Sequence, residues 1–189
     1  MAGKGNCSSV FGAVYRENQM DNKENYSHVE HTFAPVYDSR SRVMILGSFP
    51  SVKSREQNFY YGHPQNRFWI VLSRLTGWEE PETIEEKKKM LLANRIAVWD
   101  VIASCDIAGS SDSSIKNVVV NNFERILLEA PIQHIYANGA KAYDLYRKYA
   151  MEQTGREIVK LPSTSPANAA WNIERLCEAW GQVVSGIVC

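Results

Sequence analysis

The chain has 189 residues, which is enough for one domain with a sizeable core and too few for two ordinary domains. Its composition, 44% hydrophobic and 22% charged residues, is that of a globular protein, and no apolar run is long enough to span a bilayer. The formal net charge of zero excludes tight nucleic-acid binding through an overall positive charge, but not binding to a few phosphates through a local patch. The four cysteines are scattered without a Cys-x-x-Cys pair, which argues against a zinc or iron–sulfur site and fits a reducing, intracellular compartment.

The N-terminal part of the chain differs in character from the rest. Residues 1–30 are polar and lack sustained periodicity, so we expect a disordered N-terminal segment followed by a single domain over residues 31–189. Within that domain, Val43–Leu46 is a short apolar run typical of a strand that is buried on both faces, and it ends at Gly47. A long polar and aromatic loop, residues 47–66, is expected to follow this strand.

The remainder of the chain alternates between helical and strand-like patterns. Asn66 is the expected N-cap of the first helix, and Thr83 with Glu86 forms a capping box for the second. The expected helices cover residues 66–76, 81–94 and 122–129, and two more surround Tyr143–Tyr149 and Ile173–Val184. The further strands are expected over residues 96–102, 133–137 and 157–161.

This alternation of strands and helices predicts an α/β protein. We expect a three-layer αβα sandwich around a central, mainly parallel four-stranded sheet. Parallel strands place their carboxyl ends at one edge of the sheet, where open α/β folds bind their ligands. The loops at residues 47–66, 103–114 and 162–168 should therefore meet there.

Two stretches at this edge carry the main indication of function. The first is GSFPS at residues 47–51 followed by FYYGHPQNRFW at residues 59–69, and the second is LPSTSPAN at residues 161–168 with Trp171 beyond. Together they resemble the two motifs of the uracil-DNA glycosylase superfamily. The first is most similar to its hypoxanthine-DNA (deoxyinosine) glycosylase branch, often called the sixth family. The resemblance covers residues 31–184 and implies the same αβα fold, with four parallel strands at its centre.

The resemblance also implies roles for four residues around the base. Many uracil glycosylases place the attacking water with an Asn or Asp in the Gly-x-x-Pro turn, but here that position is Phe49, which can neither orient water nor bond a base. In the hypoxanthine branch the catalytic residue is the Asn of the His-Pro-x-Asn segment, which is Asn66. Tyr61 matches the aromatic residue that stacks on the base, and His63 is a candidate donor to the base or to a phosphate. The alternatives are a hydrophobic lid for Tyr61, a structural loop residue for His63 and a helix cap for Asn66.

The second motif and the turn after the first strand imply contacts with the DNA backbone, because short hydroxyls and amides bind phosphate oxygens. The candidate DNA-binding residues are Ser48, Ser51, Ser163, Thr164, Ser165 and Asn168. Lys53, Arg55 and Arg67 flank the first loop and add local positive charge. For the second motif, the alternative is an ordinary helix-capping turn with Asn168 as the N-cap.

The expected activity is that of a monofunctional DNA glycosylase that flips out hypoxanthine, releases it by hydrolysis and leaves an abasic site. We expect a monomer whose partner is DNA, with no cofactor and no metal site, and located in the cytoplasm of a bacterium or the nucleus of a eukaryote. The alternatives are a uracil- or xanthine-DNA glycosylase of the same superfamily, or a non-catalytic nucleic-acid-binding module. Asp100 and Asp112 are further polar residues near the expected site, and the sequence leaves their roles open.

Overall fold

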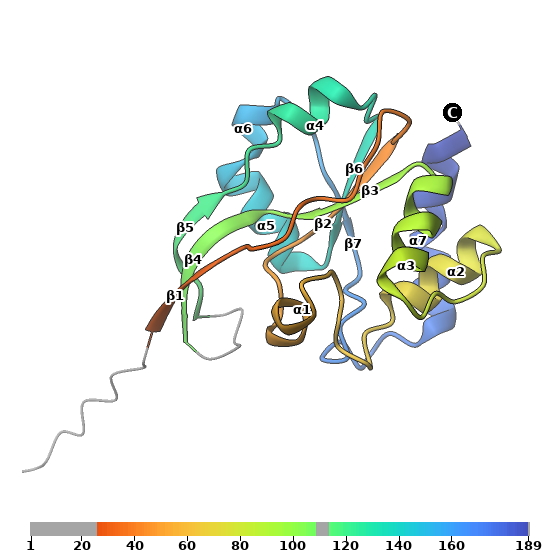
Figure 1. The fold of residues 1–189 in the computed structure, drawn as a ribbon, viewed down its shortest axis with the longest axis horizontal. Coiled ribbons are helices and arrows are strands. Elements are labelled where there is room, and N and C mark those ends of the chain that lie inside the picture. Colours follow the sequence, from red (N-terminus) through yellow and green to blue (C-terminus); the bar gives the residue numbers. More distant parts are fainter. Residues whose placement is uncertain (1–25, 109–113, 189) are drawn as a thin grey trace, which may run out of the picture.

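A parallel four-stranded sheet forms the centre of the computed structural model, which describes residues 26–108 and 114–188 (Figure 1). Its strands lie in the order β3-β2-β6-β7: β3 is Ile96–Asp100, β2 is Val43–Gly47, β6 is His134–Asn138 and β7 is Val159–Leu161. Each adjacent pair is parallel. Every residue of β2 is buried, as its continuous apolar run predicts. The prediction of a parallel four-stranded sheet is confirmed.

Helices cover both faces of this sheet, because successive side chains along a strand point to opposite sides. Val43 and Ile45 of β2 belong to one core cluster, and Met44 and Leu46 belong to the other. The helices of the first cluster are α2 (Phe68–Thr76), α3 (Ile84–Ala93) and α7 (Ile173–Val188). Those of the second are α4 (Glu124–Glu129), α5 (Ala140–Tyr149) and α6 (Met151–Thr154). The predicted three-layer αβα sandwich is therefore confirmed.

A second, antiparallel sheet was not predicted. It has the order β1-β4-β5, with β1 over Tyr26–Glu30, β4 over Ile102–Ala108 and β5 over Lys116–Val120. The expectation of a disordered segment up to residue 30 is thus wrong for β1, while residues 1–25 lie outside the described residues. The loop expected over residues 103–114 is also wrong in its first part, because β4 continues almost directly from β3.

The polar face of the second sheet explains why its strands were missed. In β4, Ile102, Cys105 and Ile107 are buried, and the residues between them are half-buried polar or small side chains. An antiparallel strand with one polar face lacks the continuous apolar run of β2 and resembles a loop in composition. The candidate residue Asp112 lies outside the described residues.

A short helix interrupts the loop that follows β2. Helix α1 covers Val52–Gln57, and its N-cap is Ser51, whose hydroxyl accepts a hydrogen bond from the Ser54 amide. The Ser54 hydroxyl in turn accepts from the Gly62 amide at 3.1 Å and so holds the aromatic part of the loop against α1. The predicted capping box of Thr83 and Glu86 is confirmed at the start of α3.

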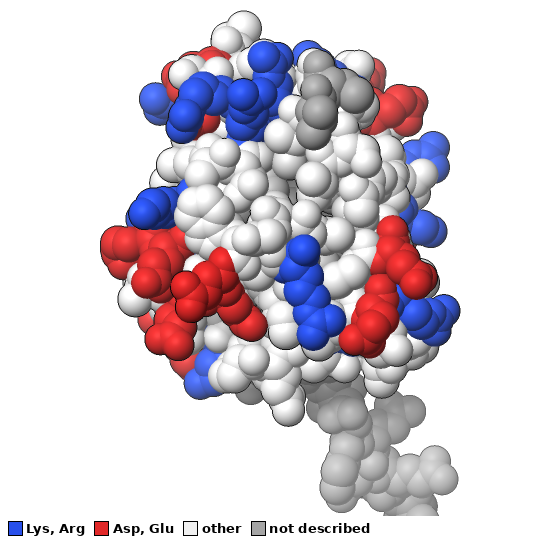
Figure 2. Space-filling model, turned by 90° about the vertical axis from the view of Figure 1, so that its right-hand side faces the viewer, with Lys and Arg blue, Asp and Glu red and all other residues white. Residues whose placement is uncertain are grey.

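The charge distribution fits a neutral protein. On the side of the molecule where α2, α3 and α7 lie, basic and acidic groups are interspersed around an uncharged centre (Figure 2).

Cys105 and Cys177 are free thiols in the described part of the chain. Among the helices described, none combines the length and apolarity needed to cross a membrane.

Candidate active site

A cavity of about 440 Å³ opens where β2, β3 and β6 end, at Gly47, Asp100 and Asn138. Its walls come from the turn after β2, from α1, from the start of α5 and from the loop after β7. The position is the one expected for a ligand site in an open α/β sheet. The polar and aromatic side chains that line it include those of Ser48, Phe49, Ser51, Arg55, Tyr60, Tyr61, Asn66, Asp100, Asn138, Lys141, Ser163 and Ser165.

Asn66 lines this cavity and is held by residues from both motifs. Its Oδ1 accepts hydrogen bonds from the Phe68 amide at 3.0 Å and from the Thr164 hydroxyl at 2.8 Å. The Thr164 hydroxyl itself accepts from Asn138 Nδ2 at 2.9 Å, and the Asn138 Oδ1 accepts from the Thr164 amide at 2.9 Å. Asn66, Thr164 and Asn138 therefore form a continuous hydrogen-bond network beside the cavity.

The directions of these hydrogen bonds determine how the Asn66 amide is oriented. A backbone N–H can only donate, so the Asn138 atom bonded to the Thr164 amide must be its oxygen, and its other atom is then the NH₂ donor. Thr164 receives that donor and has its single hydroxyl hydrogen left for the Asn66 oxygen. That oxygen already accepts from the Phe68 amide, so the Asn66 NH₂ group is left to donate elsewhere.

Asn66 also contributes to the start of α2. The helix begins at Phe68, two residues later than predicted, and the Asn66 side chain bonds the Phe68 amide although Arg67 occupies the N-cap position. The prediction of Asn66 as the N-cap is therefore wrong in position, although its side chain still accepts from the first amide of the helix. The same side chain lines the cavity, so the capping role and a catalytic role can coexist in one amide.

Tyr61 lines the cavity with a ring that is already stacked on the protein. Its centroid lies 3.8 Å from that of Phe68 with the planes 21° apart, so a base could stack only on its opposite face. The hydroxyl is buried and lies beside Asn138 without a well-directed hydrogen bond. Burial raises the pKa of Tyr61, and the charge of Asp100 raises it further, so the phenol stays protonated.

Phe49 occupies the cavity wall at the position where the superfamily's turn can carry an amide or a carboxylate. Its side chain is only 8% exposed, and the guanidinium of Arg55 lies 5.7 Å from its ring centroid. Arg55 also donates to the Pro50 carbonyl at 2.8 Å, which ties α1 to the turn. The aromatic ring at position 49 thus contributes shape and stacking to the wall and no hydrogen bond.

His63 lies in a tight turn and is not among the described residues that line the cavity. Its Nδ1 accepts from the Gln65 amide at 3.1 Å, and its carbonyl accepts from the Asn66 amide at 2.8 Å. The structure therefore gives His63 the role of a loop residue that positions Asn66. A contact from its other ring nitrogen to DNA remains a proposal.

Arg67 joins the two motifs through the backbone of the second loop. Its guanidinium donates to the carbonyls of Thr164, Ser165, Asn168 and Trp171. These carbonyls belong to a segment with little secondary structure of its own, so the arginine satisfies groups that no strand or helix pairs. The expectation that Arg67 supplies positive charge for phosphates is therefore corrected, because its donors are used inside the protein.

The second loop divides its predicted DNA contacts into buried and accessible residues. Thr164 is completely buried and serves the Asn66 network, so the predicted direct DNA contact by Thr164 does not fit the structure. Ser163 and Ser165 line the cavity and are half-buried, whereas Asn168 lies off the cavity wall and donates to the Ser163 carbonyl at 2.9 Å. The alternative considered for Asn168, the N-cap of the last helix, is also wrong, because the Arg175 amide donates to Asn172 Oδ1.

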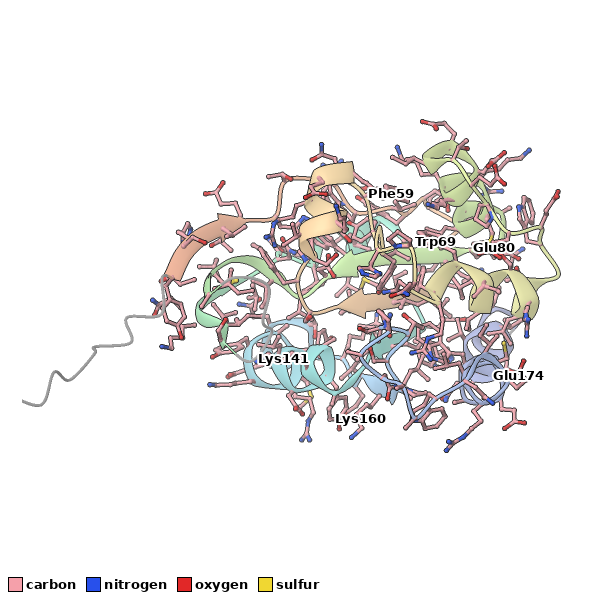
Figure 3. The ribbon with its side chains drawn as sticks, turned by 90° about the horizontal axis from the view of Figure 1, so that it is seen from below. Phe59, Trp69, Glu80, Lys141, Lys160 and Glu174 are labelled. Carbon is pink, nitrogen blue, oxygen red and sulfur yellow. The ribbon has the colours of Figure 1, made fainter. Side chains whose placement is uncertain are left out.

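Sequence reasoning missed the contribution of the turn between β6 and α5. Gly139 has a φ of 97°, and a Cβ atom there would lie 2.9 Å from the Ser163 Cβ, so only glycine allows this close approach of the two loops. Lys141 follows in the first turn of α5 (Figure 3), and it is one of the residues that line the cavity. The sequence did contain an indication of this turn, because an apolar strand ends at Asn138–Gly139 just as β2 ends at Gly47.

Asp100 is the second missed feature, because its partner is distant in sequence. It lies at the end of β3, lines the cavity and is bonded to His31, with 2.9 Å between His31 Nε2 and Asp100 Oδ2. The sequence placed Asp100 near the expected site but left its role open and gave no indication of His31 as its partner. Among residues 26–108 and 114–188, no three His, Cys, Asp or Glu side chains gather in a way that could hold a metal ion.

Known proteins resemble this chain over most of its length. A family model described as the uracil DNA glycosylase superfamily matches residues 34–183. The hypoxanthine DNA glycosylase of Methanosarcina acetivorans is 34% identical over 152 residues, covering 79% of this chain and 95% of its own length. That of Methanosarcina barkeri is 33% identical over 139 residues, covering 72% of this chain and 86% of its own. A solution NMR structure from M. acetivorans, described provisionally as a uracil DNA glycosylase, has a TM-score of 0.71 at 34% identity and covers 83% of this chain and 97% of that chain. The chain belongs to the uracil DNA glycosylase superfamily.

Proposed function

We propose that this protein is a monofunctional DNA glycosylase that flips hypoxanthine out of DNA, releases it by hydrolysis and leaves an abasic site. Relatives that are 33–34% identical over most of their length carry the name hypoxanthine DNA glycosylase. The observation that carries the proposal at the level of residues is the orientation of Asn66. Its oxygen is occupied by two donors inside the protein, and its NH₂ group belongs to a side chain that lines the cavity.

A donor at this place suits the chemistry of base release. When the N-glycosidic bond breaks, the leaving base takes the bonding electrons and becomes anionic, while the sugar becomes oxocarbenium-like. A fixed donor aimed at the leaving base stabilises this charge in the transition state. The acceptors O6 and N7 that guanine presents are also present in hypoxanthine, so the Asn66 NH₂ has a partner on this base.

Aromatic residues provide the rest of the proposed base pocket. Extruding a nucleotide costs a few kcal/mol, and stacking on an aromatic ring returns about 1–3 kcal/mol. The Tyr61 ring, supported from behind by Phe68, is the proposed platform, and Phe49 closes the wall where other glycosylases carry a polar residue. The purine leaving group is larger than uracil, and the cavity of about 440 Å³ has room for either base.

Contacts to the DNA backbone are proposed for the mouth of the cavity. Ser48, Ser51, Ser163 and Ser165 present hydroxyls there, and Lys141 lies in the first turn of α5, where backbone amides and the helix dipole favour a phosphate. Because few cationic groups take part, we expect modest affinity with a weak dependence on salt. A protein with this substrate would act as a monomer inside the cell, in bacterial cytoplasm or in a nucleus.

The test is release of free base from oligonucleotides that each contain one deaminated base. Hypoxanthine, uracil and xanthine would be placed in otherwise identical labelled duplexes and single strands, and abasic sites would be detected by alkaline strand cleavage under single-turnover conditions. We expect the hypoxanthine strand to be cleaved fastest. Faster release of uracil or xanthine would support a different base specificity, and release of no base with retained DNA binding would support a non-catalytic module.

A further inference from the structure

The described part of the chain contains two hydrogen-bonded His–Asp pairs, and they differ sharply in burial. His31 Nε2 lies 2.9 Å from Asp100 Oδ2, and the two side chains are 2% and 6% exposed. His28 Nδ1 lies 2.8 Å from Asp106 Oδ1, and those side chains are 57% and 27% exposed. Burying a carboxylate and an imidazole costs free energy even when they are paired, so the buried pair calls for a functional explanation that the exposed pair does not.

The buried pair lies directly at the candidate active site. Asp100 lines the cavity, and its Oδ1 lies so close to Gly47 that a Cβ atom at that residue would be 2.1 Å away. The Tyr61 hydroxyl would lie 3.5 Å from the same Cβ position, which places the phenol and the carboxylate on the same side of Gly47 at the end of β2. Asp100 faces His31 and the phenols of Tyr60 and Tyr61, both of which are kept protonated by burial and by its charge.

Hydrolysis needs a group that places and deprotonates water, and the turn after β2 does not provide one. Phe49 occupies the position where an Asn or Asp could do so, and the oxygen of Asn66 is occupied by the Phe68 amide and the Thr164 hydroxyl. Asp100 reaches the same cavity from the neighbouring strand, where it pairs directly with Gly47 in the parallel ladder. The missing carboxylate of the turn thus has a counterpart on β3.

We propose that Asp100 is the general base that receives a proton from the hydrolytic water, and that His31 is a positioning residue that holds its carboxylate. This inference rests on the proposed glycosylase function. As the bond between C1′ and N9 breaks, its electron pair leaves with hypoxanthine. The water oxygen forms the new bond to C1′, and one water proton passes to an Asp100 oxygen. That proton is then returned to the released base anion or to solvent, so no oxidant, reductant or further reactant is needed.

The surroundings of His31 fit a positioning role. Its ring lies 4.4 Å from Phe33, 6.1 Å from Tyr60 and 6.4 Å from Phe49, measured between ring centroids. Its backbone amide donates to the Ala103 carbonyl at 2.7 Å. A ring enclosed in this way can donate its Nε2–H to Asp100 Oδ2 in only one orientation. This hydrogen bond therefore also fixes the position of the other carboxylate oxygen, Oδ1.

The experiment compares Asp100→Asn with Asp106→Asn, since each removes the carboxylate of one His–Asp pair and keeps an acceptor for the histidine. Single-turnover release of hypoxanthine should fall roughly a hundredfold or more in Asp100→Asn and stay within twofold in Asp106→Asn. Binding of the oligonucleotide should be unchanged in both. His31→Gln keeps a donor in a less rigid side chain, and its release rate should fall several-fold with binding unchanged.

Azide distinguishes a lost base from a damaged fold, because it attacks C1′ without giving up a proton. In Asp100→Asn, azide should restore release and leave a sugar azide, detected by mass, while the wild type should still form the ordinary abasic site. Asp100→Glu is measured alongside in case Asp100→Asn does not fold, and its displaced oxygens should slow water-dependent release at least tenfold. Normal release in folded Asp100→Asn or Asp100→Glu, or a slow Asp100→Asn that azide does not restore, would overturn the proposal. Absence of hypoxanthine release by the wild type would instead refute the proposed function.

Discussion

Replacing Asn66 with aspartate separates a catalytic amide from a helix cap. Aspartate keeps an oxygen that accepts from the Phe68 amide and the Thr164 hydroxyl, but it replaces the NH₂ donor with a second oxygen. Loss of one donor to a developing anion costs roughly 10²–10³ in rate, or about 2.7–4 kcal/mol. The new negative charge would add to this cost by repelling the leaving base. We therefore expect a folded protein with almost no base release.

Replacement of Asn66 with alanine makes a different prediction for stability. It removes a cap interaction worth about 1 kcal/mol and leaves the buried Thr164 hydroxyl without its acceptor, at about 1–3 kcal/mol. Asn66→Ala should thus melt well below the wild type, whereas Asn66→Asp should melt close to it. Asn66→Ser keeps a short acceptor and should fold but lose most activity for lack of the amide.

The assay is single-turnover release of hypoxanthine with enzyme in excess, recorded beside the melting temperature of each variant. Asn172→Asp is the matched control, because Asn172 Oδ1 accepts from the Arg175 amide at the start of α7, and the residue is exposed and outside the cavity wall. This control should keep full release. Wild-type release by folded Asn66→Asp or Asn66→Ser would show that the Asn66 amide is a cap and not a catalytic group.

Three further predictions concern the platform, the loops and the independence from metal. Tyr61→Phe removes a hydroxyl without a well-directed partner, so stability and most base release should be retained. Tyr61→Ala removes the stacked ring as well and should lose both. Equal damage in the two variants would assign the function to the hydroxyl. Arg67→Met should lower the melting temperature by removing the side-chain donors of four carbonyls, and it should leave the salt dependence of DNA binding unchanged. Lys141→Met should instead reduce the logarithmic salt slope by about 1. The reverse pattern, measured by binding titrations at several salt concentrations, would contradict these assignments. Base release should persist in EDTA, since hydrogen-bond donors and a carboxylate are proposed to do the chemistry; a requirement for an added divalent ion would refute this.

The parallel core could be predicted because its physical requirements appear directly in the sequence. A strand buried on both faces must be apolar throughout, as Val43–Leu46 is, and a helix start needs donors satisfied by nearby side chains, as Thr83 and Glu86 do at α3. The antiparallel sheet could not be predicted in the same way. Only β4 has fully buried residues, whereas β1 and β5 have none, so the two outer strands are stabilised by pairing with β4 rather than by their own composition.

The candidate site was predicted to the extent that its residues lie in contiguous motifs. Asn66, Phe49 and Tyr61 all line the cavity as expected, because each belongs to a segment attached to the end of β2 or the start of α2. The His31–Asp100 pair was not predicted, since its members are 69 positions apart and neither is unusual in its local sequence. The same limit applies to Asn138, which meets Thr164 only in the folded protein.

The neighbouring residues Asn66 and Arg67 of the first motif both bond to Thr164 of the second, so the two motifs act as one unit. Asn66 receives a hydrogen bond from the Thr164 hydroxyl, and the next residue, Arg67, donates to the Thr164 carbonyl. The backbone that Arg67 holds in place is therefore the same backbone that orients the Asn66 amide. A change at Arg67 should reach the chemistry through Thr164, even though the guanidinium contacts neither the base nor, by this proposal, the DNA. The guanidinium of Arg67 holds the second loop in place from inside the protein. A chain with no net charge can therefore form a nucleic-acid site in which few cations face the DNA.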